Sequence, residues 1–189
     1  MKKLIPILLL ILLLASTTSA ALATGMIKVW GYDDSQGGSY NIYAVTIGDT
    51  DGDGNYEVIT GGSRRVVKIF ECAGDNDFGT APVWTSTTTG NKIEVMEAGD
   101  ADGDGNDEVV VVEGGPRVYI VDYSAGSYTM STLFDVTQQV PGATSAYAED
   151  VTLYDVDGDG VLEIVIGYRY VTDTYYGHVV CYDWDGSAY

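Results

Sequence analysis

One acidic segment occurs three times in this chain, and the intervals between its copies constrain the fold more than any other feature. Residues 49–57, 100–108 and 155–163 share the pattern D-x-D-G-D-G-x-x-E without gaps, and their first aspartates are 51 and 55 residues apart. Repeats of about 50 residues are typical of arrays in which neighbouring units complete each other's core. The chain is therefore predicted to consist of repeated units.

The segments around each acidic loop read as short strands. In the second unit, β-branched and aromatic runs predict strands at 92–98, 108–113, 117–123 and 127–135, with a Gly-Gly-Pro turn at 114–116. No window has a sustained helical period with capping residues. Four antiparallel strands in about 50 residues make one β-propeller blade. The expected fold class is all-β, with about three and a half such repeats in an incomplete ring.

The expected units divide residues 26–189. A partial unit at 26–44, in which residues 27–32 look like a further strand, precedes three units at about 45–91, 92–146 and 147–189. A closed ring needs four or more blades. We therefore expect either a truncated part of a longer propeller or an open arc that needs oligomerisation or further blades to close.

Residues 1–23 have the composition of a secretory signal peptide. Lys2 and Lys3 precede an apolar run at 4–15, and small residues follow, with candidate cleavage points after Ala20 and Ala23. The apolar run is short for a membrane span, and an uncleaved anchor is the alternative. A secreted or cell-surface protein, not inserted in the membrane after cleavage, is expected.

Acidic charge dominates the rest of the chain. All 28 acidic residues follow Gly25, against seven Lys and Arg, so residues 26–189 have a net charge of −21. Repulsion opposes binding to nucleic acid or anionic lipid, and no nucleic-acid partner is expected. The many Val, Ile and Tyr residues argue against disorder. Bound cations would relieve the repulsion, because twelve of the acids are candidate ligands in the loops.

The alternating carboxylates of the loops predict three Ca²⁺ sites. Ca²⁺ takes six to eight oxygen ligands at about 2.3–2.6 Å. Glycines at the fourth and sixth loop positions permit a tight curl, and the lack of Cys and His in the loops favours a hard cation. Side chains at positions one, three, five and nine, with the carbonyl at position seven, are the expected ligands. The predicted ligands are Asp49, Asp51, Asp53, Asn55, Glu57, Asp100, Asp102, Asp104, Asn106, Glu108, Asp155, Asp157, Asp159, Val161 and Glu163.

Two alternatives for the loops are weaker. An EF-hand loop begins in the same way but needs a Glu at position twelve, between helices. Position twelve here is Thr60, Val111 or Ile166, inside expected strands. A turn that binds nothing is the other alternative, and a threefold recurrence at the repeat period argues against it.

The loop between two strands resembles the FG-GAP and VCBS repeats of integrin α-chain propellers and of many exported prokaryotic proteins, over residues 26–189. This resemblance implies a propeller in which each loop leaves the innermost strand of a blade and holds one Ca²⁺ on the ligands named above. The chain differs in its ninth-position Glu, where the integrin pattern has Asp, and in lacking the Phe-Gly signature. Integrin partners are therefore not implied.

Few other residues suggest chemistry. His178 is the only histidine and is expected on the surface of a strand, with no nucleophile elbow in the sequence. Cys72 and Cys181 fall at positions of opposite parity in non-neighbouring units, so two buried free thiols are expected rather than a disulfide. The fifteen tyrosines either pack between blades or form exposed contact area for a ligand.

Two classes of function stay open. The first is a non-catalytic exported module for binding or cell adhesion, in which Ca²⁺ is structural and a propeller face meets an extracellular protein or carbohydrate. The second is a fragment of a propeller-type extracellular enzyme, such as a polysaccharide lyase or hydrolase. The sequence has no convergent catalytic set, which favours the first class.

Overall fold

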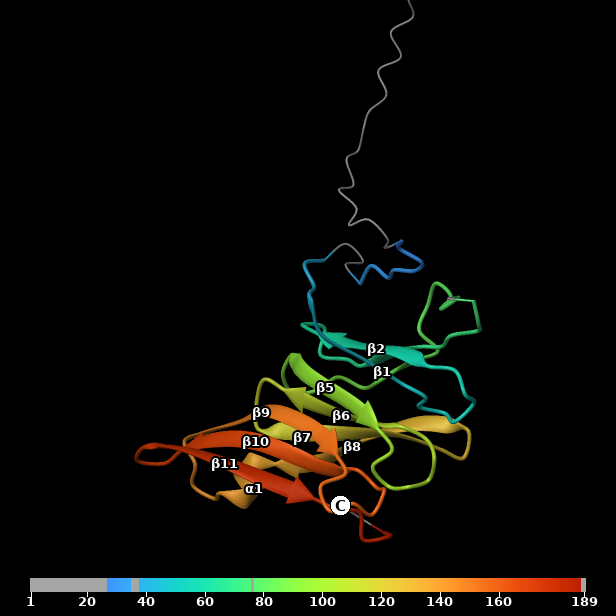
Figure 1. Cartoon of the computed structure of the whole chain (residues 1–189). Helices are drawn as coiled ribbons and strands as arrows, with labels where there is room; N and C mark the ends of the chain where they lie inside the picture. The colour runs from blue at the N-terminus through green and yellow to red at the C-terminus, as the bar shows by residue number, and fades with distance from the viewer. Residues whose placement is uncertain (1–26, 35–37, 76, 188–189) are drawn as a thin grey trace, which may run out of the picture.

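The computed structural model describes residues 27–34, 38–75 and 77–187, which form three antiparallel sheets stacked face to face (Figure 1). The first sheet contains β1 (Ile42–Gly48), β2 (Glu57–Gly62), β3 (Lys68–Phe70) and β4 (Trp84–Thr85). The second contains β5 (Ile93–Gly99), β6 (Glu108–Glu113), β7 (Arg117–Ser124) and β8 (Ser127–Asp135). The third contains β9 (Ser145–Tyr154), β10 (Glu163–Val171) and β11 (Tyr175–Tyr182).

Within each sheet the strands pair in chain order, and the first strands β1, β5 and β9 contact one another in turn. This is the arrangement of neighbouring propeller blades, and the described residues form an open arc rather than a closed ring. The all-β prediction is confirmed. The expected signal peptide at 1–23 lies outside the described residues. In the described part of the chain, no helix is both long and apolar enough to cross a membrane.

The predicted strands of the second unit are confirmed almost residue for residue. β6 and β8 have the predicted bounds, β5 is shifted by one residue at both ends, and β7 is one residue longer than predicted. The sequence analysis did not predict the one-turn helix α1 (Val136–Gln139) that follows β8. Asp135 caps this helix, because its side chain accepts a hydrogen bond from the Thr137 backbone N–H.

The strand expected at 27–32 is wrong. Residues 27–34 form no strand, and side-chain contacts hold them in place instead. The rings of Trp30 and Tyr32 lie 5.2 and 4.6 Å from that of Phe70. Asp34 forms ion pairs with Lys68 and Arg64. These aromatic and ionic contacts hold the segment against the first sheet without strand pairing.

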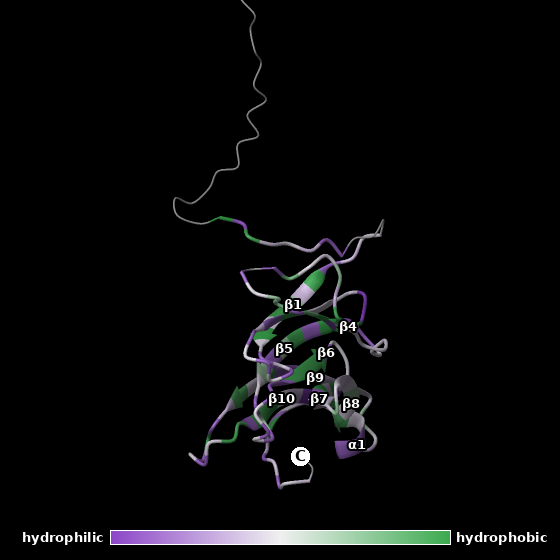
Figure 2. Ribbon diagram, turned by 90° about the vertical axis from the view of Figure 1, so that its right-hand side faces the viewer, coloured by the Kyte–Doolittle hydropathy of each residue, from purple (hydrophilic) through white to green (hydrophobic). Residues whose placement is uncertain are grey.

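The middle sheet is buried on both faces, and β6 shows this most clearly. All six of its residues are buried. Val109 and Val111 pack into the core shared with the first sheet, whereas Val110 and Val112 pack into the core shared with the third. This division follows from the two-residue period of a strand. The hydrophobic colour in Figure 2 accordingly lies mainly on the strands inside the stack.

A β-bulge interrupts the first strand of every sheet at the same place. In β1, Ile42 and Ala44 pair with adjacent residues of β2, so the residue between them has no partner. The same break occurs in β5 and β9. The extra residues are Tyr43, Glu94 and Glu149. Their separations of 51 and 55 residues equal those of the acidic loops, so the bulge belongs to the repeat.

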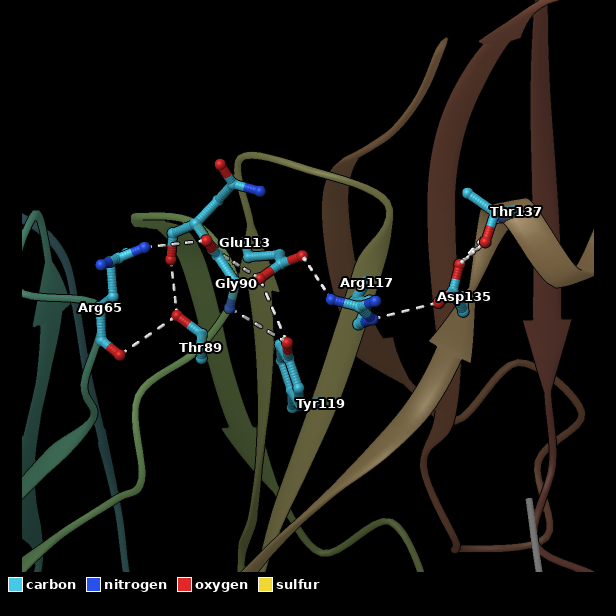
Figure 3. Close-up of polar contacts among 9 residues, drawn as sticks. Arg65, Thr89, Gly90, Glu113, Arg117, Tyr119, Asp135 and Thr137 are labelled. Carbon is cyan, nitrogen blue, oxygen red and sulfur yellow. Dashed lines mark hydrogen bonds and ion pairs between the residues drawn. The ribbon is translucent and has the colours of Figure 1, made fainter. Parts of the chain in front are cut away.

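A polar network joins the first two sheets at the end opposite the acidic loops (Figure 3). The Arg65 guanidinium donates to the Gly90 carbonyl oxygen at 3.1 Å. Glu113 is fully buried, and its Oε2 accepts from the Asn91 backbone N–H at 2.9 Å and from the Tyr119 hydroxyl at 3.2 Å. The chain that crosses between the sheets is thus fastened to a buried carboxylate.

Replacing Glu113 with Ala should lower the free energy of unfolding by about 1–3 kcal/mol, because the Asn91 N–H and the Tyr119 hydroxyl both lose their acceptor. Chemical denaturation monitored by circular dichroism measures this change. Glu149→Ala is the control, since Glu149 makes only an exposed ion pair with Arg169 and should cost less than about 1 kcal/mol. Equal effects of the two variants would contradict the prediction.

Candidate metal centres

Each acidic segment connects the first and second strands of its sheet: β1 to β2, β5 to β6 and β9 to β10. The three loops lie along one edge of the stack, at the right in Figure 1. Position twelve of each loop falls within β2, β6 or β10. The flanking elements are strands, so the structure confirms that the loops are not EF-hands.

Backbone hydrogen bonds curl each loop around its first aspartate. The N–H of the sixth residue donates to this aspartate at 3.0 Å in the first loop and at 3.2 Å in the other two. The N–H of the seventh residue donates to the fifth-position aspartate at 2.8 Å in every loop. The fourth- and sixth-position glycines all have φ between 72° and 99°, a region that favours residues without a Cβ. The loops therefore share one backbone conformation.

The ninth-position glutamates begin β2, β6 and β10, and all three are buried. Glu57 is 0 % exposed, Glu108 1 % and Glu163 4 %. In each case Oε2 accepts the backbone N–H of the second loop residue, at 2.6 Å from Thr50, 2.9 Å from Ala101 and 2.5 Å from Val156. The other oxygen, Oε1, is buried and has no hydrogen-bond partner in the described structure.

Each of these glutamates thus has two different roles for its oxygens. One oxygen accepts the loop backbone N–H, and the other is buried without a hydrogen-bond partner. A buried carboxylate oxygen without a partner costs free energy unless a cation or a proton compensates it.

Burial and mutual repulsion also shift the pKa values of the loop carboxyl groups. Burial raises the pKa of Glu57 to about 7, against the opposing hydrogen bonds from Thr50, and raises that of Glu108 to about 8. Burial and neighbouring carboxylates also raise the pKa values of Asp51 and Asp102. Nearby negative charges and burial both disfavour the ionised form of a carboxyl group. A cation among these groups would favour the ionised form instead.

The structure brings most of the predicted acidic ligands together. In four groups, one oxygen of each carboxylate lies within 4.8 Å of the others, and atoms sharing a Ca²⁺ at about 2.3–2.6 Å lie no farther apart than about 5 Å. The groups are Asp49, Asp51 and Asp53; Asp51, Glu57 and Glu71; Asp100, Asp102 and Glu108; and Asp155, Asp157 and Glu163. Asp104 and Asp159 lie outside them, and ligation by the carbonyls of Asn55, Asn106 and Val161 stays a prediction.

The sequence analysis missed two kinds of residue around the loops. The first is the second loop residue, whose N–H holds the buried glutamate; in the first loop the Thr50 hydroxyl also donates to Glu57, at 2.6 Å. The second is Glu71, which follows β3 and joins the group of Asp51 and Glu57. The segments at 67–72, 118–123 and 179–184 resemble one another, and the fifth residue of each is an acid: Glu71, Asp122 and Asp183. This recurrence in the sequence could have identified Glu71 as a candidate residue.

Neighbouring loops are connected to each other. The Asp107 backbone N–H donates to the Asp49 carbonyl oxygen at 2.9 Å, and its carboxylate accepts the Asp49 N–H at 2.9 Å. At the equivalent place in the third loop, Leu162 makes only the backbone contact, to Asp100 at 3.4 Å. The first and second loops are therefore joined more closely than the second and third.

Neither the cysteines nor the histidine belongs to the four carboxylate groups found among the described residues. Cys72 and Cys181 are free, as predicted, but the prediction that they are buried is wrong. Cys72 is half-buried just after β3, and Cys181 is exposed because β11 is the edge strand of its sheet. His178 is exposed on the same strand, where its Nε2 lies 3.2 Å from the Tyr170 hydroxyl.

Comparison with protein families gives one match that repeats along the chain. The model described as an FG-GAP-like repeat matches residues 49–111 and again residues 100–166. Each match begins at the first aspartate of a loop and extends past the following loop. Together the matches span well over half of the 189 residues. No curated protein matches the chain.

Substituting Ala for Asp107 should lower the free energy of unfolding by about 1–2 kcal/mol, because the half-buried Asp49 N–H loses a charged acceptor. Asp107→Asn should recover most of this loss, since its amide oxygen can accept the same hydrogen bond. Urea denaturation of the two variants beside the unsubstituted chain measures both effects. If the Asn variant were as unstable as the Ala variant, the contact between the loops would not be the cause.

Proposed function

Because this chain belongs to the FG-GAP-like repeat family, we propose that each of its three loops binds one Ca²⁺ ion and that the metal is structural. FG-GAP repeats often bind Ca²⁺. The observation that carries the proposal is the trio of buried glutamates, each with one unpartnered oxygen beside the loop aspartates. A hard cation satisfies these oxygens, and the donor set consists of oxygen atoms only.

The chain's own residues account for the structural role. Position-nine Glu begins the second strand and also holds the second residue of the loop, so an ion on its free oxygen connects the strand to the curl. The loop carboxylates repel one another until a cation lies among them. With a dissociation constant of about 10⁻⁴ M and a millimolar Ca²⁺ concentration, each occupied site stabilises a domain by roughly 1.4 kcal/mol.

We further propose that the module is exported and acts by binding rather than by catalysis. FG-GAP repeats are typical of extracellular proteins. Exposed aromatic side chains on β11 support an extracellular protein or carbohydrate as partner: Tyr176 and His178 stack with the half-buried Tyr170 of β10, with ring centroids 5.2 Å apart in both pairs. His178 thus contacts tyrosines, which favours a binding role for this residue. The mass of the protein recovered from the medium of the producing cells tests export and cleavage.

Removing Ca²⁺ should destabilise the chain by about 4 kcal/mol if all three sites are filled at millimolar concentration. Thermal unfolding by circular dichroism, in millimolar Ca²⁺ and then in excess chelator, measures the difference. Magnesium should replace calcium poorly, because it demands a smaller octahedral site. Identical unfolding midpoints with Ca²⁺ and with chelator would sink the proposal.

The variant Asp102→Ala should bind two Ca²⁺ ions instead of three, because it removes a carboxylate from the second loop only. Isothermal titration calorimetry gives the stoichiometry, and the retained β-type circular dichroism signal shows that the rest of the fold persists. Asp122→Asn, a neighbouring substitution outside the predicted ligand set, is the control and should keep three sites. Loss of all binding in Asp102→Ala would contradict independent sites.

A further inference from the structure

We propose that the first loop has an additional metal ligand, Glu71, and therefore binds Ca²⁺ more tightly than the other two loops. This inference rests on the proposed calcium function and concerns a residue outside the D-x-D-G-D-G-x-x-E segment. Glu71 follows the last residue of β3, in the strand that pairs with β2. It reaches the loop from across the sheet rather than along the chain.

Strand register places Glu71 beside the buried glutamate of the loop. Val58 pairs with Phe70, so the residues one step further, Glu57 and Glu71, lie opposite each other on the same face. Two acids in this relation repel each other, and such a pair is destabilising without a compensating charge. Here both carboxylates have a buried Oε1 with no hydrogen-bond partner in the described residues.

The same two carboxylates belong to one potential metal group. Oxygen atoms of Asp51, Glu57 and Glu71 all lie within 4.8 Å of one another. Asp51 also belongs to the group with Asp49 and Asp53, so Glu71 is connected to the whole loop through a shared ligand. Glu57 is 0 % exposed, so bulk water does not reach its carboxylate, and one cation would satisfy the unpartnered oxygens of both glutamates.

The second loop shows what happens when the acid is one methylene shorter. Val109 pairs with Val121, which places Asp122 opposite Glu108 as Glu71 is opposite Glu57. Asp122 is not in the group of Asp100, Asp102 and Glu108. Instead Asp102, Glu108 and Asp122 line one cavity of about 210 Å³. The acid is present at the second loop, but its side chain stops short of the other carboxylates.

The third loop repeats the aspartate. Ile164 pairs with Tyr182, so Asp183 follows opposite Glu163, outside the group of Asp155, Asp157 and Glu163. The carboxylate groups thus bring five acidic side chains together at the first site and three at each of the others. Calcium affinity in loops of this kind rises with the number of charged ligands. The first site is therefore the tightest of the three.

Exchanging the side-chain lengths tests this inference directly. Glu71→Asp should weaken the first site by roughly tenfold, and Asp122→Glu should strengthen the second site by a similar factor, since ligand charge and reach set the affinity. Titration with Ca²⁺ followed by two-dimensional ¹H–¹⁵N NMR resolves the sites. The reporters are the amide resonances of Gly54, Gly105 and Gly160, whose N–H groups donate to the first aspartate of each loop.

In the unsubstituted chain, the Gly54 resonance should reach its end point at lower Ca²⁺ concentration than the Gly105 and Gly160 resonances. In Glu71→Asp only the Gly54 curve should move to higher concentration, and in Asp122→Glu only the Gly105 curve should move to lower concentration. Three equal curves that neither variant changes would overturn the role of Glu71 and leave the calcium function intact. No movement of any glycine resonance would overturn the calcium function itself.

Discussion

The bond between a buried glutamate and the second residue of its loop is the interaction on which each unit depends. Glu57, Glu108 and Glu163 start the second strand of their sheets and use one oxygen to hold the returning loop. The strand and the loop are thereby fixed by one side chain. Burying a carboxylate costs free energy. A cation beside the unpartnered second oxygen would offset that cost. If the loops bind Ca²⁺ as proposed, the same group couples folding to metal binding.

The sheets depend on one another in a comparable way. β6 is buried from end to end, and its alternate valines fill two separate cores. A sheet of this composition cannot be stable with either face in water, so the second unit needs both of its neighbours. Glu113 adds buried hydrogen bonds between the first two sheets. The other units have no glutamate at this place, because Gly62 and Tyr168 occupy the equivalent positions. The units therefore share a plan without sharing every contact.

Much of this structure follows from the sequence because it is periodic. The loops, the four strands of the second unit and the class of fold were predictable from recurrence, β-propensity and turn residues. Glu71 was not predicted, although an acid recurs there, because its role requires the register between β2 and β3. The contact of Asp107 with Asp49 joins residues 58 positions apart and depends on how the units stack. The expected strand at 27–32 failed because its likeness to the later strands lies in composition, whereas its aromatic rings pack on Phe70.

The bulges have a consequence for how the chain can change in length. Tyr43, Glu94 and Glu149 each precede the first aspartate of their loop by six residues, so the segment from bulge to loop has the same length in all three sheets. The four extra residues in the interval to the third loop lie after Asp122, in the stretch that contains β8, α1 and the connection to β9. This stretch differs in length between the units whereas the spacing from bulge to loop does not, so we expect inserted residues to disturb the loops least in this stretch.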